Sequence, residues 1–169
     1  MEVAGSSIGV AHEDSLRPRP KREKPASIVP PLISDKPMAV IDTQVLLDWL
    51  VFADARVARW VGAVERGELS WIACPAMRRE FAHMVAHPRL ARWQPRSEHA
   101  LRVFDRYAVL LGEPVAAAAP LRCRDANDQV FVDLALQHRA RWLLTRDKAL
   151  LALARKSRVL GTEIFEPRA

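Results

Sequence analysis

Short apolar runs alternate with longer stretches of helical periodicity between residues 38 and 161. The runs predicted as strands are 38–42, 69–73, 141–145 and a short one at 158–161. The helices predicted between them are 45–52, 56–66, a segment that starts at Pro75 and ends before Pro88, 97 to about 112, 126–139 and 148–154. Such alternation is typical of right-handed crossovers that build a parallel sheet. The sequence therefore predicts an α/β fold, with three α/β/α layers around a mostly parallel sheet.

Residues 1–37 differ in composition from the rest of the chain. They hold a Gly-Ser-Ser triplet, a mixed run of charges and prolines at 17–24, and four further prolines. Such a segment buries too little apolar surface to offset the entropy lost on ordering. We expect a disordered N-terminal extension over 1–37, or a natural start at Met38, and one folded domain over 38–169.

The chain carries a net charge of +6, of which residues 1–37 contribute +1 and residues 38–169 contribute +5. Most of the basic residues are arginine, whose planar guanidinium pairs well with phosphate oxygens. A basic surface favours a polyanionic partner such as RNA or DNA. An arginine-rich base composition of the source genome would give the same charge.

The sequence shows no sign of a membrane segment or a leader. No apolar run approaches the ~18 residues of a membrane span, and the first residues lack the apolar core of a signal peptide. Cys74 and Cys123 match no metal-binding spacing and are expected to be free thiols. We therefore expect a cytoplasmic protein without membrane contact.

Two acidic residues follow predicted strands. Asp42 comes directly after Met-Ala-Val-Ile, and Asp147 comes shortly after Trp-Leu-Leu-Thr. Ligands of an open parallel sheet bind beyond the carboxyl ends of its strands, so both residues should face the same edge. Either residue alone is explained as the N-cap of the next helix. The coincidence of two at the ligand edge favours a functional role.

Glu80 borders the apolar face of the helix that Pro75 begins. The apolar residues of this helix recur at i, i+4, i+7 and i+8 from Met77. At about 100° per residue, Glu80 lies beside that stripe whereas Arg79 points away from it. A carboxylate in this position needs a bound cation or a salt bridge to one of the many arginines.

Asp125 and Asp128 stand at the start of the helix predicted over 126–139. With Asp125 as the N-cap and Asp128 at N3, the pair resembles a capping box, and both charges suit the helix dipole. This local role is the simpler interpretation. It still leaves Asp128 on the first turn, close to a pocket at the end of the 141–145 strand.

These carboxylates form a set that suits a divalent cation. Mg²⁺ prefers hard oxygen ligands and retained water. One or two such ions can orient a phosphate, activate water and stabilise a leaving oxygen. Thr43 and Thr145, next to two of the acids, are candidates for placing water or phosphate. Three basic neighbours are candidate phosphate contacts: Arg124, Arg146 and Lys148.

Three segments resemble PIN-domain ribonucleases, and in particular the bacterial subgroup identified as toxin components of toxin–antitoxin systems. They are 40–45 (Val-Ile-Asp-Thr-Gln-Val), 123–131 (Cys-Arg-Asp-Ala-Asn-Asp-Gln-Val-Phe) and 143–148 (Leu-Leu-Thr-Arg-Asp-Lys). The resemblance extends over residues 38–169. Gln44, Ala126 and Asn127 depart from the usual Asn, Pro and Asp of the family, whereas the principal acids remain.

The resemblance implies a PIN-like fold and endonucleolytic cleavage of RNA that depends on Mg²⁺ or Mn²⁺. By position, Asp42, Glu80, Asp128 and Asp147 match the catalytic, metal-binding acids of the family, and Asp125 matches a further acid of the subgroup. A cognate antitoxin and a homodimer are also implied. The alternative is a non-catalytic module of the same fold that binds RNA or an antitoxin. A signalling domain with a phosphoacceptor Asp fits less well, because its paired acids and late Lys are not evident.

Overall fold

The computed structural model describes residues 36–115 and 121–168, which fold around a five-stranded sheet. The strands are β1 (Met38–Ile41), β2 (Ser70–Ala73), β3 (Ala108–Leu110), β4 (Trp142–Leu144) and β5 (Glu163–Phe165). Their order is β3-β2-β1-β4-β5, and every pairing between them is parallel. The expected extension over 1–37 lies outside the described residues, apart from 36 and 37.

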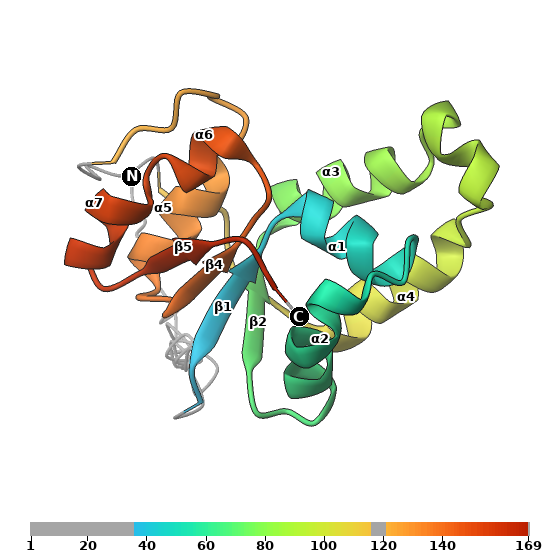
Figure 1. Ribbon diagram of the computed structural model, residues 1–169, viewed down its shortest axis with the longest axis horizontal. Coiled ribbons are helices and arrows are strands. Elements are labelled where there is room, and N and C mark those ends of the chain that lie inside the picture. The colour runs from blue at the N-terminus through green and yellow to red at the C-terminus, as the bar shows by residue number, and fades with distance from the viewer. Residues whose placement is uncertain (1–35, 116–120, 169) are drawn as a thin grey trace, which may run out of the picture. The chain divides into compact units, whose positions relative to one another are not determined.

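Helices cover both faces of the sheet. They are α1 (Thr43–Leu50), η1 (Ala55–Val57), α2 (Ala58–Glu65), α3 (Pro75–Val85), η2 (Pro88–Trp93), α4 (Ser97–Tyr107), α5 (Gln129–Gln137), α6 (Lys148–Leu151) and α7 (Ala154–Val159). Helices α1 to α4 lie on one side and α5 to α7 on the other (Figure 1). The predicted three-layer α/β/α fold is confirmed. None of the described helices is long and apolar enough to cross a bilayer.

The strand order reverses between β1 and β4. The chain moves from β1 to β2 and β3, returns to β4 on the other side of β1, and continues outward to β5. Neighbouring strands whose connections diverge leave a crevice at their carboxyl ends. Ile41 lies opposite Leu144 in the register, and the Asp42 amide donates to the Leu144 carbonyl at 2.9 Å. The residues that follow β1 and β4 therefore meet at this crevice.

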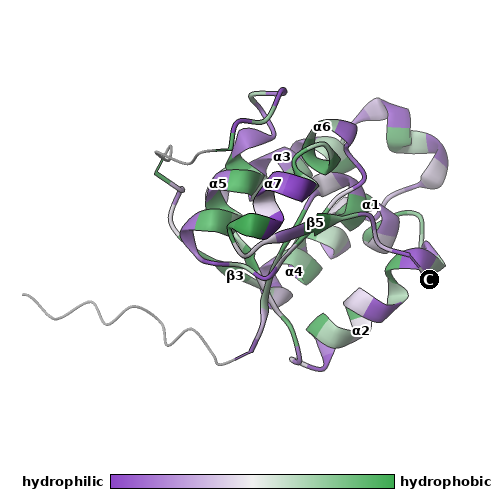
Figure 2. Ribbon diagram, turned by 60° about the vertical axis from the view of Figure 1, so that its left-hand side comes forward, coloured by the Kyte–Doolittle hydropathy of each residue, from purple (hydrophilic) through white to green (hydrophobic). Residues whose placement is uncertain are grey.

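The core joins the sheet to the apolar stripes of the helices. Trp71, Phe81, Phe104 and Phe131 are among its largest fully buried side chains. Phe104 of α4 lies 4.6 Å from the Trp71 ring and 5.6 Å from the Phe81 ring, centroid to centroid. Helix α5 is largely hydrophobic, whereas α7 is mostly hydrophilic (Figure 2). The buried stripe of α3 follows the predicted periodicity from Met77 to Val85.

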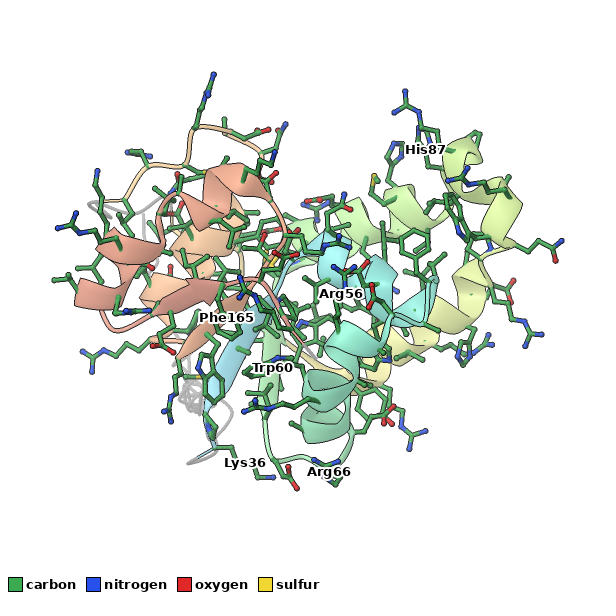
Figure 3. The ribbon with its side chains drawn as sticks, viewed as in Figure 1. Lys36, Arg56, Trp60, Arg66, His87 and Phe165 are labelled. Atoms are coloured by element: carbon green, nitrogen blue, oxygen red, sulfur yellow. The ribbon has the colours of Figure 1, made fainter. Side chains whose placement is uncertain are left out.

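A second aromatic cluster anchors α2 to the β4–β5 side of the sheet. The Trp60 ring lies 5.2 Å from Trp142 and 5.3 Å from Phe165, centroid to centroid. Figure 3 shows Trp60 and Phe165 approaching each other from α2 and from the end of β5. Gly67 follows this helix with a positive φ of 68°, as expected for a residue just beyond a helix C-terminus.

Two predictions that concern the edge strands are wrong. The helix expected to run from Ser97 to about residue 112 ends at Tyr107, and Ala108–Leu110 instead pairs with β2 as β3. The pairing with β2 overrides the helical preference of the local sequence. The strand expected at 158–161 belongs to the end of α7 and the turn after it. Gly161, with φ of 90°, follows the helix end, and the strand begins only at Glu163.

An ion-pair network ties α1 to the turn after β4. Asp48 is 4% exposed on α1, and its two oxygens accept from the Arg146 guanidinium at 2.9 and 3.0 Å. Arg146 also lies 3.5 Å from Glu166, which in turn pairs with Arg56. A buried carboxylate depends on such a partner, because an unpaired charge in the interior is costly.

We predict that Arg146→Ala lowers the free energy of unfolding by about 1–3 kcal/mol, because it leaves Asp48 buried without its cation. The matched control is Arg66→Ala, which removes an exposed ion pair with Glu68 and should cost less than about 1 kcal/mol. Urea unfolding of both variants measures the difference. Equal, small losses would show that the Asp48–Arg146 pair does not hold α1 in place.

Candidate active site

Asp42 is the most buried acid at the crevice. It follows β1, caps α1 and is 4% exposed. One of its oxygens, Oδ2, accepts from the Thr145 hydroxyl at 2.6 Å, and Oδ1 accepts from the Gln44 amide at 3.4 Å. Burial raises the pKa of Asp42, the Thr145 hydrogen bond opposes that rise, and the charge of Asp147 adds to it. The expected role of Asp42 as a helix cap is confirmed. The same carboxylate also lies within electrostatic range of Asp147.

Asp147 reaches the same place from β4. Its amide donates to the Thr145 hydroxyl at 2.9 Å, so Thr145 links the two strand-end acids. As the N-cap of α6, Asp147 accepts from the amides of Ala149 and Leu150 at 2.6 and 3.2 Å. Both amides bind Oδ1, so Oδ2 accepts no hydrogen bond from the described residues. Asp147 can therefore cap its helix and still offer an oxygen to a ligand.

Glu80 enters from α3, which packs against α1. The side chain of Thr43, the residue directly after Asp42, lies near the Glu80 carboxylate. Burial raises the pKa of Glu80, and the charges of Asp42 and Asp125 raise it further. Glu80 is half-buried whereas Arg79 is exposed, as the helical periodicity predicts.

The block at 125–128 differs from the expected capping box. Helix α5 begins at Gln129, and Asp128 stands at the N-cap position without a side-chain capping bond. Asp125 instead accepts from the Asn127 amide at 2.9 Å within a turn before the helix. The capping-box prediction is wrong because the chain turns at 125–128 rather than beginning the helix there. The Asp128 carboxylate is left half-buried beside the other acids.

The acids act on one another electrostatically. Burial and the negative charges of Asp147, Asp125, Asp42 and Glu80, in that order, raise the pKa of Asp128 to about 6. Asp128 therefore lies within electrostatic range of the four other acids singled out from the sequence. Crowded carboxylates of this kind hold protons more tightly, and a bound cation relieves the repulsion between them.

The donor set suits a hard divalent cation. The side chains at the crevice offer carboxylate and hydroxyl oxygens, which Mg²⁺ and Mn²⁺ prefer. Cys123 lies within range of Asp125, Asp128 and Asp147, but burial and these charges raise the pKa of its thiol. Both cysteines are free, as expected. Within residues 36–115 and 121–168, however, no three His, Cys, Asp or Glu side chains stand close enough together to hold a metal ion as they are.

The three basic residues expected near the acids differ in their surroundings. Arg146 is engaged by Asp48 and Glu166, whereas Arg124 and Lys148 are exposed. Gln129 was not expected to have a role from the sequence. It accepts from the Cys123 backbone N–H at 2.7 Å and donates to the Leu121 carbonyl and to Asp133 at 3.1 and 2.8 Å. Gln129 thereby fixes the loop before the acidic block. Its only sequence signal is the i, i+4 spacing to Asp133.

Comparison with known proteins places these features in a wider group. The family model described as PIN domain matches residues 38–149. The crystal structure of VapBC2 from Rickettsia felis, bound to a DNA fragment from its promoter, has a similar fold with a TM-score of 0.53 and 8% sequence identity. The match covers 76% of this chain and 98% of that one. The search of curated proteins gave no significant match.

We predict that Asp128→Asn raises the melting temperature by a few degrees at about pH 7.5 in metal-free buffer, and by less at about pH 4.5. The pKa of Asp128 in the folded state, about 6, lies above its ordinary value of 3.8. The proton that Asp128 binds therefore stabilises the folded state fully below pH 3.8, and this stabilisation is lost as the pH rises through about 6. Circular dichroism with a chelator measures it. The control Asp105→Asn should instead lower the melting temperature at about pH 7.5, because Arg78 lowers the pKa of Asp105. An equal change of melting temperature in Asp128→Asn at both pH values would contradict the raised pKa of Asp128.

Proposed function

The chain belongs to the PIN domain family, and on this premise we propose that it is a metal-dependent endoribonuclease that hydrolyses RNA phosphodiester bonds. The observation that carries the proposal is the convergence of Asp42, Glu80, Asp128 and Asp147 at the β1–β4 crevice, from four different elements. Four carboxylates at a ligand-binding edge are costly for the fold, which is the usual mark of a functional site.

Asp42, Asp128 and Asp147 would hold Mg²⁺ or Mn²⁺, and Glu80 would complete the site or orient the attacking water. When bound, the cation supplies charge for the phosphate oxygens and lowers the pKa of bound water. Thr145 fixes the orientation of Asp42 through its hydroxyl, and the Thr43 side chain lies near Glu80. Arg124 and Lys148, both exposed, are the better candidates for phosphate contact, because Arg146 is already paired with Asp48.

We further propose that the nuclease domain spans 38–169 and is the toxin of a toxin–antitoxin pair. The acidic block at 123–131, which resembles that subgroup, and the fold shared with the VapBC2 structure support an antitoxin partner. A homodimer and a cytoplasmic location accord with such a role. The net charge of +5 on residues 38–169 accords with an RNA substrate.

One observation favours the second candidate, a non-catalytic module that binds RNA or an antitoxin. No three potential ligands among the described residues are close enough to hold a metal ion without moving. A binding module would keep the fold and the basic charge without needing the acids to converge further. Turnover that depends on metal separates the two candidates.

We predict that the protein cleaves a mixed RNA substrate only when Mg²⁺ or Mn²⁺ is present, and that Asp42→Asn lowers the rate by at least roughly 100-fold. Loss of a residue that merely orients a metal ligand costs about 10–100-fold, and loss of a ligand should cost more. Asparagine still caps α1, so the fold should survive. Gel analysis of cleavage products measures the rate.

Asp105→Asn is the matched control, because Asp105 is an exposed residue of α4 that pairs with Arg78 of α3. It should cleave at the unmodified rate. Cleavage without metal, or unchanged cleavage by a folded Asp42→Asn variant, would contradict the nuclease assignment. Binding of RNA without any cleavage would favour the non-catalytic module.

A further inference from the structure

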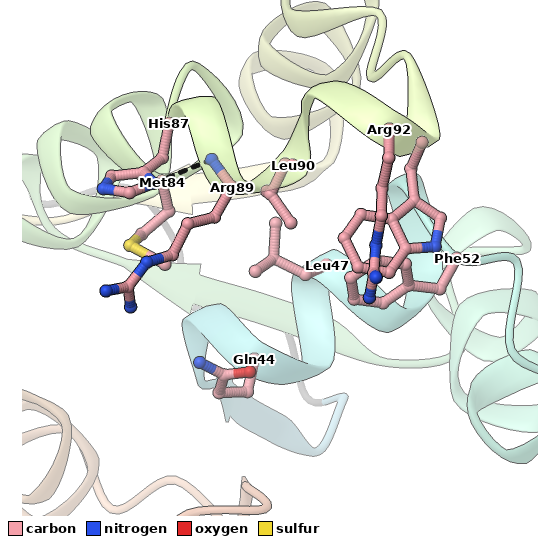
Figure 4. A pocket seen from close by; sticks show the side chains of 9 residues that line it. Gln44, Leu47, Phe52, Met84, His87, Arg89, Leu90 and Arg92 are labelled. Carbon is pink, nitrogen blue, oxygen red and sulfur yellow. Dashed lines mark hydrogen bonds between the residues drawn. The ribbon is translucent and has the colours of Figure 1, made fainter.

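A pocket of about 600 Å³ lies between α1, α3 and η2. This is within the usual size of a small-ligand site. Its floor is apolar, with Leu47 and Leu90 both buried. Phe52 stands at one end, and Met84 and His87 at the other (Figure 4). The Trp93 ring, which also lines the pocket, contacts Phe52. The pocket therefore offers an apolar surface with an aromatic end.

The rim of the pocket is basic. Three of the nine residues that line it are His87, Arg89 and Arg92, and none of the nine carries a carboxylate. Neither arginine forms an ion pair with any residue in the described part of the chain. Arg56, Arg66, Arg78 and Arg146, by contrast, are each paired with an acid. The two pocket arginines are thus available to an anionic ligand.

The aromatic end of the pocket is arranged for stacking. The Arg92 guanidinium lies 3.7 Å from the centroid of the Trp93 ring, and the Phe52 ring meets Trp93 edge-on at 5.0 Å. Trp93 remains 40% exposed. Bases of single-stranded nucleic acids stack on aromatic rings and on guanidinium planes alike. An incoming base can extend the existing guanidinium–indole stack.

The backbone holds both aromatic residues at points where the chain reverses. Ala53, directly after Phe52, has φ of 51°, and Gln94, directly after Trp93, has φ of 47°. Residues other than glycine rarely adopt this left-handed conformation, which costs free energy. The positions of Phe52 and Trp93 are therefore set by the backbone as well as by packing.

The pocket continues from the candidate active site along the α1–α3 interface. Gln44 lines the pocket, and its backbone N–H donates to Asp42 Oδ1 at 3.4 Å. On α3, Met84 lies one helical turn beyond Glu80, a rise of about 6 Å. At ~3.4 Å per stacked nucleotide, this rise equals about two nucleotides between Glu80 and the near end of the pocket. A strand cut at the crevice would thus reach the pocket without leaving the surface.

We propose that this pocket binds a base of the single-stranded RNA a few nucleotides from the cleaved bond, with the base on the Arg92–Trp93 stack and the neighbouring phosphate at Arg89. The inference rests on the proposed function for the identity of the RNA. The absence of carboxylates among the lining residues and the continuity with the acids favour RNA over a partner helix. Trp93 is then a residue that positions the substrate and helps to select it.

The test is equilibrium binding of a labelled single-stranded RNA of mixed sequence, and of an abasic strand with the same backbone, measured by fluorescence anisotropy. Asp42→Asn serves as the parent so that no strand is cut. Trp93→Ala should weaken RNA binding by about 5- to 100-fold, the effect of losing one stacked base, and should leave the abasic strand unaffected. Trp93→Phe should restore most of the affinity.

A matched pair tests the rim. Arg92→Ala should weaken RNA binding more than Arg155→Ala, which removes an exposed arginine on α7, away from the pocket. Unchanged RNA binding by a folded Trp93→Ala variant overturns the proposal. Equal weakening of binding to RNA and to the abasic strand also overturns it.

The outcomes separate this inference from the proposed nuclease activity. If the protein shows no metal-dependent cleavage but Trp93→Ala abolishes base-dependent binding, the pocket assignment stands and the proposed nuclease function is wrong. If the protein cleaves RNA in the presence of metal and binds RNA equally well with and without Trp93, the nuclease function stands and the pocket assignment is wrong.

Discussion

The hydrogen bond from Thr145 to Asp42 joins the two strands on which the candidate site depends. It spans 2.6 Å between the residues that follow β4 and β1, and the same hydroxyl accepts from the Asp147 amide. The parallel register, with Ile41 opposite Leu144, makes this contact unavoidable. The strand order reverses at these two strands, so the crevice for a ligand opens at the point that Thr145 holds together.

The acids around this point contribute to the stability of the fold in opposite directions. Asp42 and Asp147 contribute as helix caps, which recovers part of the cost of placing them at the crevice. Asp128 forms no capping bond, and the repulsion of its neighbours raises its pKa to about 6. A divalent cation would relieve that repulsion and draw the carboxylates closer than they stand without it. The Arg92–Trp93 pocket extends the same surface away from the acids.

Local pattern in the sequence was enough to predict the three central strands, the α3 stripe and the strand-end acids. Those features depend on apolar periodicity and on the rule that parallel strands end at one edge. Strand β3 and the start of α5 were missed, because pairing with β2 and the turn at 125–128 override local preference. The role of Arg146 could not be foreseen, since its partner Asp48 lies 98 residues earlier in the chain. The pocket at Trp93 likewise joins residues from three separate elements.

The central claim is that the acids at the β1–β4 crevice hold a divalent cation, and direct titration with Mn²⁺ tests it most simply. Electron paramagnetic resonance follows the free Mn²⁺ as protein is added, without any substrate. We predict saturable binding to the unmodified protein and to Asp105→Asn, and its loss in Asp42→Asn. Failure of the unmodified protein to bind Mn²⁺, or equal binding by all three, would contradict the assignment of these acids as a metal site.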